Sequence, residues 1–249
     1  MQNFTTKTIR EIAVEMPVTT RVFEEFKIDY CCGGGRSFAS ACQSAGVAPE
    51  VVSQKLNQVL ITQVQTNTET PLQKQSLSEL IDYILEKHHI YTKQELTRLS
   101  ALMEKVCSKH GANHQELFPL QTYFTELYDD LMPHMLKEEN ILFPFIKQLE
   151  MADLHNLSSP KPPFGTIKNP VRMMMTEHDK DGEILRKMRE TSGDYKIPDG
   201  ACPSFQALYF GLEELEKDLH RHIHLENNVL FPDAVILEQK VMLVNLNTY

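Results

Sequence analysis

The chain has 249 residues, 41% of them hydrophobic and 24% charged, so it is long enough to bury a core and is neither disordered nor fibrous. Its formal net charge of −9 argues against a general binder of nucleic acid or of anionic membranes, because both need a net basic surface. There is no membrane-spanning apolar run and no signal peptide, and the odd number of five cysteines does not suggest a disulfide framework. We therefore expect a soluble, cytoplasmic protein whose partners are metals, small molecules or proteins.

The N-terminal part, 1–65, is charge-balanced and predicts a small helical domain. Caps, prolines and glycines delimit four short helices, at 8–16, 20–28, 37–45 and 49–60. Between the second and third lies the segment DYCCGGGR, in which Cys31 and Cys32 precede three glycines and Arg36. A tight turn beside an arginine would lower a thiol pKa, so we predict a functional thiol role for Cys31 and Cys32. The alternative is a glycine-rich turn with incidental thiols, and an inert role is expected for Cys42, Cys107 and Cys202.

The C-terminal part, 77–249, predicts an all-α bundle that follows a polar linker at 66–76. Apolar residues recur at helical spacing in four long stretches: 76–108, 116–150, 169–190 and 203–238. The connections between the later helices are rich in Pro, Gly, Ser and Asp, which is typical of a helical bundle. Pro144 and Pro232 fall inside helical stretches and are expected to kink or end them.

An internal repeat carries candidate metal ligands. The segments HMLKEENILFP, starting at His134, and HIHLENNVLFP, starting at His222, lie 88 residues apart. His89 and His178 precede the two copies by 45 and 44 residues, so the halves form a duplicated helix pair. Within each copy, His and Glu at positions i and i+4 project from one helix face.

Two carboxylates brought together inside a bundle need a compensating cation, because buried like charges are prohibitively costly. Imidazole nitrogens with bridging carboxylates suit a pair of iron or manganese ions better than a closed four-coordinate zinc site. The predicted metal ligands are His89, His134, Glu138, His178, His222 and Glu226.

Other clustered side chains are expected to have supporting roles. His89 is preferred to His88, because His89 continues the apolar face of its helix. His220 and His224 point roughly 160° away from His222 by the helical period, which favours surface or supporting positions. A structural or surface role is also expected for the pair His110 and His114, for His155 and for the core-packing run Met173 to Met175.

Together, the segment IDYCCGGG at 28–35, the Glu177-His178-Asp179 step and the two repeated motifs resemble the iron-sulfur cluster repair di-iron proteins, the repair-of-iron-centres family. The resemblance covers nearly the whole chain. It implies a hemerythrin-like antiparallel four-helix bundle behind a small N-terminal domain, and a non-haem di-iron centre with an oxo or hydroxo bridge. By position, the family's ligands fall on the same six residues. Glu226 stands where oxygen-carrying hemerythrin has aspartate, which disfavours reversible oxygen carriage.

The resemblance also implies a function. Family members restore iron-sulfur clusters damaged by nitrosative or oxidative stress, so we expect damaged iron-sulfur proteins as partners and donation of iron from the di-iron centre. Cys31 and Cys32 would then receive iron, electrons or a nitrosyl group. Two alternatives stay open, a nitric oxide reductase and a sensor of oxygen or redox state, as does a homodimer formed through the N-terminal arm. No nucleic-acid or membrane partner is expected.

Overall fold

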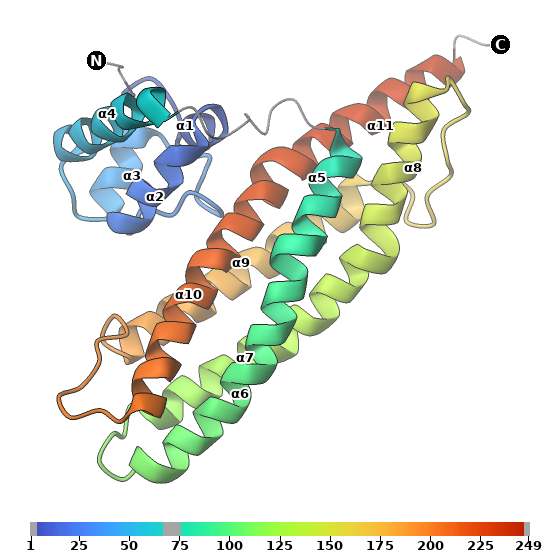
Figure 1. Ribbon diagram of the computed structural model, residues 1–249. Coiled ribbons are helices and arrows are strands. Elements are labelled where there is room, and N and C mark those ends of the chain that lie inside the picture. The colour runs from blue at the N-terminus through green and yellow to red at the C-terminus, as the bar shows by residue number, and fades with distance from the viewer. Residues whose placement is uncertain (1–3, 67–75, 247–249) are drawn as a thin grey trace.

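The structure is a computed structural model that describes residues 4–66 and 76–246. Within these residues every regular element is helical, and the one β-bridge joins Thr8 and Ser37. Figure 1 shows a cluster of shorter helices lying beside a long bundle of helical rods. The predicted all-α class with a four-helix bundle is confirmed. The predicted linker at 66–76 stays a prediction, because 67–75 lie outside the described residues.

The small cluster has its own apolar core. Its elements are α1 (Ile9–Glu15), the 3₁₀ turn η1 (Pro17–Thr19), α2 (Thr20–Glu25), α3 (Phe38–Ser44) and α4 (Pro49–Thr66). Thr8 and Ser37 begin α1 and α3 by accepting hydrogen bonds from backbone N–H groups one turn ahead. Phe23, Tyr30 and Phe38 are fully buried among the aliphatic residues of these helices. This packing fixes the loop between α2 and α3, which carries the paired cysteines.

Each rod of the bundle is one long helix or two helices joined by a π-helical turn. The rods are α5 (Leu77–Ile84), η3 (Leu85–His89) and α6 (Ile90–His110); α7 (Leu117–Lys137), η4 (Glu138–Leu142) and α8 (Phe143–Leu154); α9 (Lys168–Thr191); and α10 (Pro203–Leu225), η5 (Glu226–Leu230) and α11 (Phe231–Leu246). The rod segment α7 packs against α9, α6 against α10, and α8 against α11. No helix in the described ranges is long and apolar enough to cross a bilayer.

Two apolar cores fill the bundle, one toward each end. Leu99, Leu127 and Leu212 belong to the core nearer the α6–α7 loop, whereas Ile81 and Ile146 belong to the core at the opposite end. Along the rods, the predicted ligands lie at or next to the boundary between these two cores. Water-excluding layers therefore enclose the polar middle of the bundle on both sides.

Pro144 and Pro232 do not end their helices as expected, because a π-helical turn precedes each of them. The N–H of Phe143 donates to the carbonyl of Glu138, five residues back, and the N–H of Phe231 does the same to Glu226. The extra residue in the turn changes which carbonyl faces the proline ring, so the helix passes the proline without the steric clash of an α-helix. Both turns begin at a predicted glutamate ligand.

Candidate metal centre

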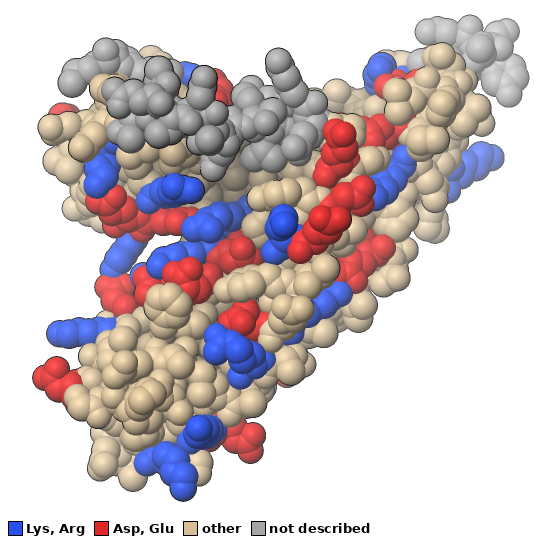
Figure 2. Space-filling model, in the orientation of Figure 1, with Lys and Arg blue, Asp and Glu red and all other residues tan. Residues whose placement is uncertain are grey.

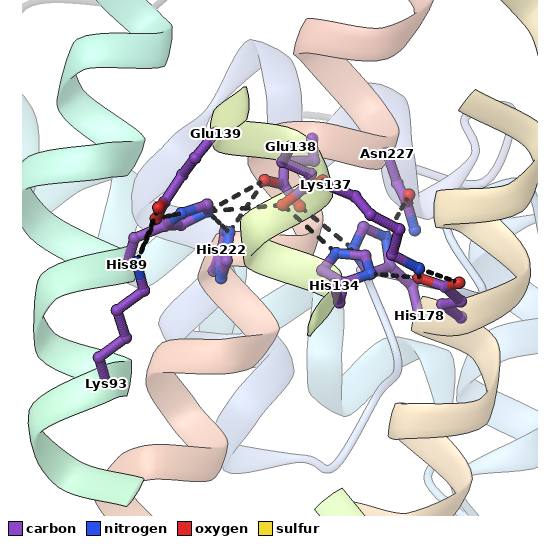
Figure 3. Close-up of polar contacts among 11 residues, drawn as sticks. His89, Lys93, His134, Lys137, Glu138, Glu139, His178, His222 and Asn227 are labelled. Atoms are coloured by element: carbon purple, nitrogen blue, oxygen red, sulfur yellow. Dashed lines mark hydrogen bonds and ion pairs between the residues drawn. The ribbon is translucent and has the colours of Figure 1, made fainter. Parts of the chain in front are cut away.

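The six predicted ligands, which come from all four rods, meet in the middle of the bundle. His89 ends η3, His178 lies in α9, and the other four occupy the junctions α7–η4 and α10–η5. All six are at most 2% exposed. Figure 3 shows His89 and His222 on one side of Glu138 and His134 and His178 on the other.

The side chains form two four-residue groups that share both glutamates. One group holds His89 and His222, whose Nε2 atoms are 3.1 Å apart, and the other holds His134 and His178, whose Nε2 atoms are 3.0 Å apart. Glu226 reaches both groups, with Oε1 2.9 Å from His222 Nε2 and Oε2 3.2 Å from His178 Nε2. Glu138 also faces both groups, with Oε2 3.3 Å from His134 Nε2 and 3.5 Å from His89 Nε2.

Three of the four carboxylate oxygens in this cluster lack an ordinary hydrogen-bond partner among the described residues. Neither oxygen of Glu138, nor Oε2 of Glu226, has a hydrogen-bond partner among the described residues. An uncompensated buried carboxylate costs several kcal/mol. Cations that bind between the imidazole nitrogens and these oxygens remove that cost, so the donor set fits two metal ions.

Hydrogen bonds outside the cluster set the orientation of the imidazole rings. His89 Nδ1–H donates to Glu139 Oε1 (2.8 Å) and His134 Nδ1–H donates to Glu177 Oε2 (2.8 Å). Because a carboxylate only accepts, Nδ1 must carry the proton, which leaves the Nε2 lone pair for a metal. Each of these carboxylates also pairs with a lysine that lies one helical turn after the histidine: Lys93 pairs with Glu139, and Lys137 pairs with Glu177.

The other two histidines are supported differently. His178 Nδ1–H donates to Asn227 Oδ1 at 2.9 Å. His222 Nδ1 has no hydrogen-bond partner in the described part of the chain, but the ring of His88 stacks on the His222 ring with centroids 5.6 Å apart. His88 is itself buried and donates from Nδ1 to Asp218. His88 therefore supports a predicted ligand rather than joining the ligand cluster.

The metal-free cluster holds protons where metals would bind. Burial alone would lower the pKa of His89, but the negative carboxylates of Glu138 and Glu226 beside it outweigh burial and raise the pKa to about 10. The pKa of Glu226 lies well below its usual range, because nearby histidines more than offset the effect of burial. A metal that enters the cluster must therefore displace a proton from His89.

The paired cysteines lie beside this cluster and not within it. The expected lowering of a thiol pKa is wrong for Cys31, because its hydrogen bond to Cys32 and its burial raise the pKa well above the usual range. Cys32 Sγ is 3.6 Å from the backbone oxygen of His178. Asn228 Nδ2 donates to the carbonyls of Tyr30 (3.1 Å) and Cys31 (3.2 Å), so the cysteine loop is docked on η5. A Cβ at Gly34 would come within 2.9 Å of Asn228 Oδ1, which explains a glycine at this close approach.

Several expectations for other residues were wrong in part. His224, for which a surface or a supporting position was expected, is not at the surface: it is buried, because Tyr30 packs on its ring and Asn228 bonds to its Nδ1. Of the three consecutive methionines, only Met174 lies in the core, while Met173 and Met175 are exposed.

The remaining histidine expectations fit the structure. His155 is exposed. His110 contacts Cys202 Sγ at 3.1 Å, and both His110 and His114 pack on Phe205, so this pair has a packing role.

Sequence reasoning missed the residues that orient the ligands. Glu139, Glu177 and Asn227 each stand next to a predicted ligand in the chain, and that adjacency is the only sequence signal for them. Their partners lie 43 to 50 residues away on other rods.

Comparison with known proteins agrees with this arrangement. Residues 80–234 match the hemerythrin HHE cation binding domain, and residues 5–60 match ScdA_N, a domain of unknown function (DUF542). The iron-sulfur cluster repair protein YtfE of Escherichia coli O17:K52:H18 (strain UMN026) is 34% identical over 229 residues, which cover 90% of this chain and 94% of that protein. The proteins of the same name from Shigella boydii serotype 4 (strain Sb227) and E. coli K12 (DH10B) match to the same extent. With both parts of the chain and nearly its whole length matched, the protein belongs to the YtfE family of iron-sulfur cluster repair proteins.

Proposed function

We propose that this protein repairs damaged iron-sulfur clusters in the cytoplasm by donating iron from a di-iron centre. The observation that carries the proposal is the pair of buried glutamates shared between two sets of histidines. The relatives, which are iron-sulfur cluster repair proteins by name, support the same function. Damaged iron-sulfur proteins are then the partners that accept the iron.

The spacing of the histidine nitrogens supports iron in preference to structural zinc. Two nitrogens about 2.1 Å from one metal are about 3.0 Å apart at a right angle and about 3.4 Å apart at a tetrahedral angle. The two Nε2 pairs are 3.1 and 3.0 Å apart. A right-angled arrangement of nitrogen and carboxylate ligands is typical of six-coordinate iron or manganese, and four protein ligands leave positions open.

The protein residues would make iron release feasible by replacing its charge. In the metal-free cluster His89 would hold a proton on Nε2, and that proton would partly compensate the charges of Glu138 and Glu226. Glu139, held by Lys93, keeps the His89 ring oriented throughout. Bound iron supplies an exchangeable, redox-active cation, and the surrounding residues control how readily it exchanges.

The experiment measures iron content and repair together. Anaerobically reconstituted protein is expected to bind about two irons per chain, with the coupled Mössbauer spectrum of a bridged pair, and to reactivate a dehydratase whose iron-sulfur cluster has been damaged. Glu138→Gln removes a shared carboxylate and should abolish both results. Glu104→Gln, at an exposed position of the same bundle, should change neither. A wild-type protein that holds paired iron but cannot reactivate the dehydratase would contradict the proposal.

Open coordination positions also favour a second function, reduction of nitric oxide. Two nitric oxide molecules, two electrons and two protons give nitrous oxide and water, and a diferrous pair supplies two electrons. Nitrous oxide at background level, from diferrous protein with an electron donor, would rule this function out.

A further inference from the structure

A cleft of about 1380 Å³ lies between the small helical cluster and the bundle. The loop after α2 lines one side, and α9 and α10 line the other. Figure 2 shows side chains of both charge signs gathered where the two parts meet. Asp29, Cys31 and Cys32 face this cleft. Both thiols are free.

The loop is built around the carboxylate of Asp29. Its Oδ1 accepts hydrogen bonds from the backbone N–H groups of Cys31 (3.1 Å) and Cys32 (2.9 Å), and its Oδ2 accepts one from Gly33 (2.9 Å). A Cβ at Gly33 would lie 2.8 Å from Asp29 Oδ2, so a larger residue would displace the carboxylate. These contacts hold Asp29 Oδ1 beside the thiols, with Cys31 Sγ 3.4 Å away.

The separations between these three side chains match a tetrahedral metal site. Ligands at about 2.3 Å for sulfur and about 2.0 Å for oxygen place two sulfurs about 3.8 Å apart, and a sulfur and an oxygen about 3.5 Å apart. The observed Sγ–Sγ distance is 3.8 Å, and the Cys31 Sγ–Asp29 Oδ1 distance is 3.4 Å. All three ligand atoms lie within 4.8 Å of one another.

We propose that Asp29, Cys31 and Cys32 form a third metal site, which binds a thiophilic divalent cation such as Fe²⁺, Co²⁺ or Zn²⁺ through two sulfurs and one carboxylate oxygen. Each thiol gives its proton to solvent as the metal–sulfur bond forms, and no electron is transferred. Asp29 is exposed and Cys32 is half-buried in the lining of the cleft, so a metal there would exchange with an acceptor more easily than one inside the bundle. The mixed ligand set, one sulfur pair and one oxygen, is softer than that of the buried centre and so selects a different range of metals.

The position of this site gives it a role that rests on the proposed function. Cys32 Sγ lies 3.6 Å from the backbone oxygen of His178. Asn227 bonds to the His178 ring through Oδ1 and reaches the Cys31 carbonyl through Nδ2 (3.5 Å). The third site is therefore in contact with the backbone of His178, and Asn227 links the His178 ring to the cysteine loop. In iron donation, the third site would be an intermediate binding site for iron between the buried centre and the cleft.

Cobalt distinguishes the sites, because a thiolate bound to Co²⁺ produces a near-ultraviolet charge-transfer band that nitrogen and oxygen ligands do not. We titrate Co²⁺ anaerobically into the full chain, already loaded with two irons and with its thiols reduced. The band is expected to saturate at about one cobalt per chain in wild type and in the control Cys202→Ser. The double variant Cys31→Ser/Cys32→Ser should lose the band. Asp29→Asn should weaken cobalt binding at least tenfold. Absence of the band in wild type, or its survival in the double serine variant, overturns the proposal.

A second measurement needs no variant and therefore does not depend on variant folding. Zn²⁺ added to the iron-loaded wild type should slow alkylation of Cys32 at least tenfold, as mapped by mass spectrometry, while Cys202 reacts as before. Equal rates with and without zinc contradict the third site. If the protein fails to reactivate the dehydratase but shows the cobalt band, the proposal of iron donation is contradicted and the third site is supported. Repair without the band removes only the third site.

Discussion

The carboxylate of Glu177 tests whether residues outside the cluster control metal affinity. Glu177→Gln keeps an oxygen that accepts the His134 Nδ1–H, now 2.8 Å from Oε2, but removes its negative charge. A charge-assisted hydrogen bond contributes about 1.5–3 kcal/mol, against about 1 kcal/mol for a neutral one. The difference, about 0.5–2 kcal/mol, predicts a loss of metal affinity of about tenfold at the middle of this range, and up to about thirtyfold, at the His134–His178 position. Lys137 also loses its ionic partner, which adds a smaller, solvent-screened effect.

The assay is competition for iron between the anaerobic protein and a coloured ferrous chelator. Glu183→Gln is the matched control, since Glu183 lies on the same helix and pairs with Arg186 at the surface. One iron should be lost to the chelator at about a tenfold lower chelator concentration in Glu177→Gln than in the control or wild type. If the Glu177→Gln protein loses iron at a chelator concentration within a factor of about two of the wild-type value, the idea that this hydrogen bond strengthens His134 as a ligand is refuted.

Three further outcomes are expected. Metal uptake at neutral pH should release protons, because the His89 pKa is about 10 in the metal-free chain; equal binding heats in buffers of different ionisation enthalpy would contradict this. Burial raises the pKa of Asp181 to about 7, so its contribution to folding stability is present below about pH 4 and is lost as the pH rises through about 7. Asp181→Asn should remove that loss, worth on the order of 4 kcal/mol in denaturant unfolding of metal-free protein at pH 8. An unchanged pH profile of stability would contradict this prediction. Asn228→Ala deletes the bonds to Tyr30 and Cys31 and should speed alkylation of Cys32 about tenfold without loss of iron, whereas Asn140→Ala, at an exposed site, should not.

The cluster of predicted metal ligands was accessible from sequence because its geometry is largely local. A histidine and a glutamate four residues apart share a helix face in any α-helix, and duplication of the motif at His134 and His222 marks which pairs matter. The same period correctly separates His222 from His224 in direction. The helical period also favours His89 over His88. Burial alone would not separate the two histidines, because His88 is buried as well.

Local rules failed where another part of the chain supplies the partner. His224 points away from the ligand cluster, as expected, yet it is buried because Tyr30 from the small helical cluster covers it. Pro144 was expected to kink or end its helix, whereas the helix continues past it after a π-helical turn that starts at Glu138. Neither outcome follows from the residues near it in the chain.

The sequence by itself determined the helical class, the four rods and the six residues that converge, because these depend on periodicity and on a repeat within the chain. The tertiary structure alone decided which side chains orient those six, as with Glu139 for His89, since a hydrogen bond between rods depends on their packing and rotation. It also decided that the cysteine loop docks against His178 with Asp29 beside both thiols. Spacing along a helix is set by backbone geometry, but contact between distant segments is set by the packing of the whole molecule.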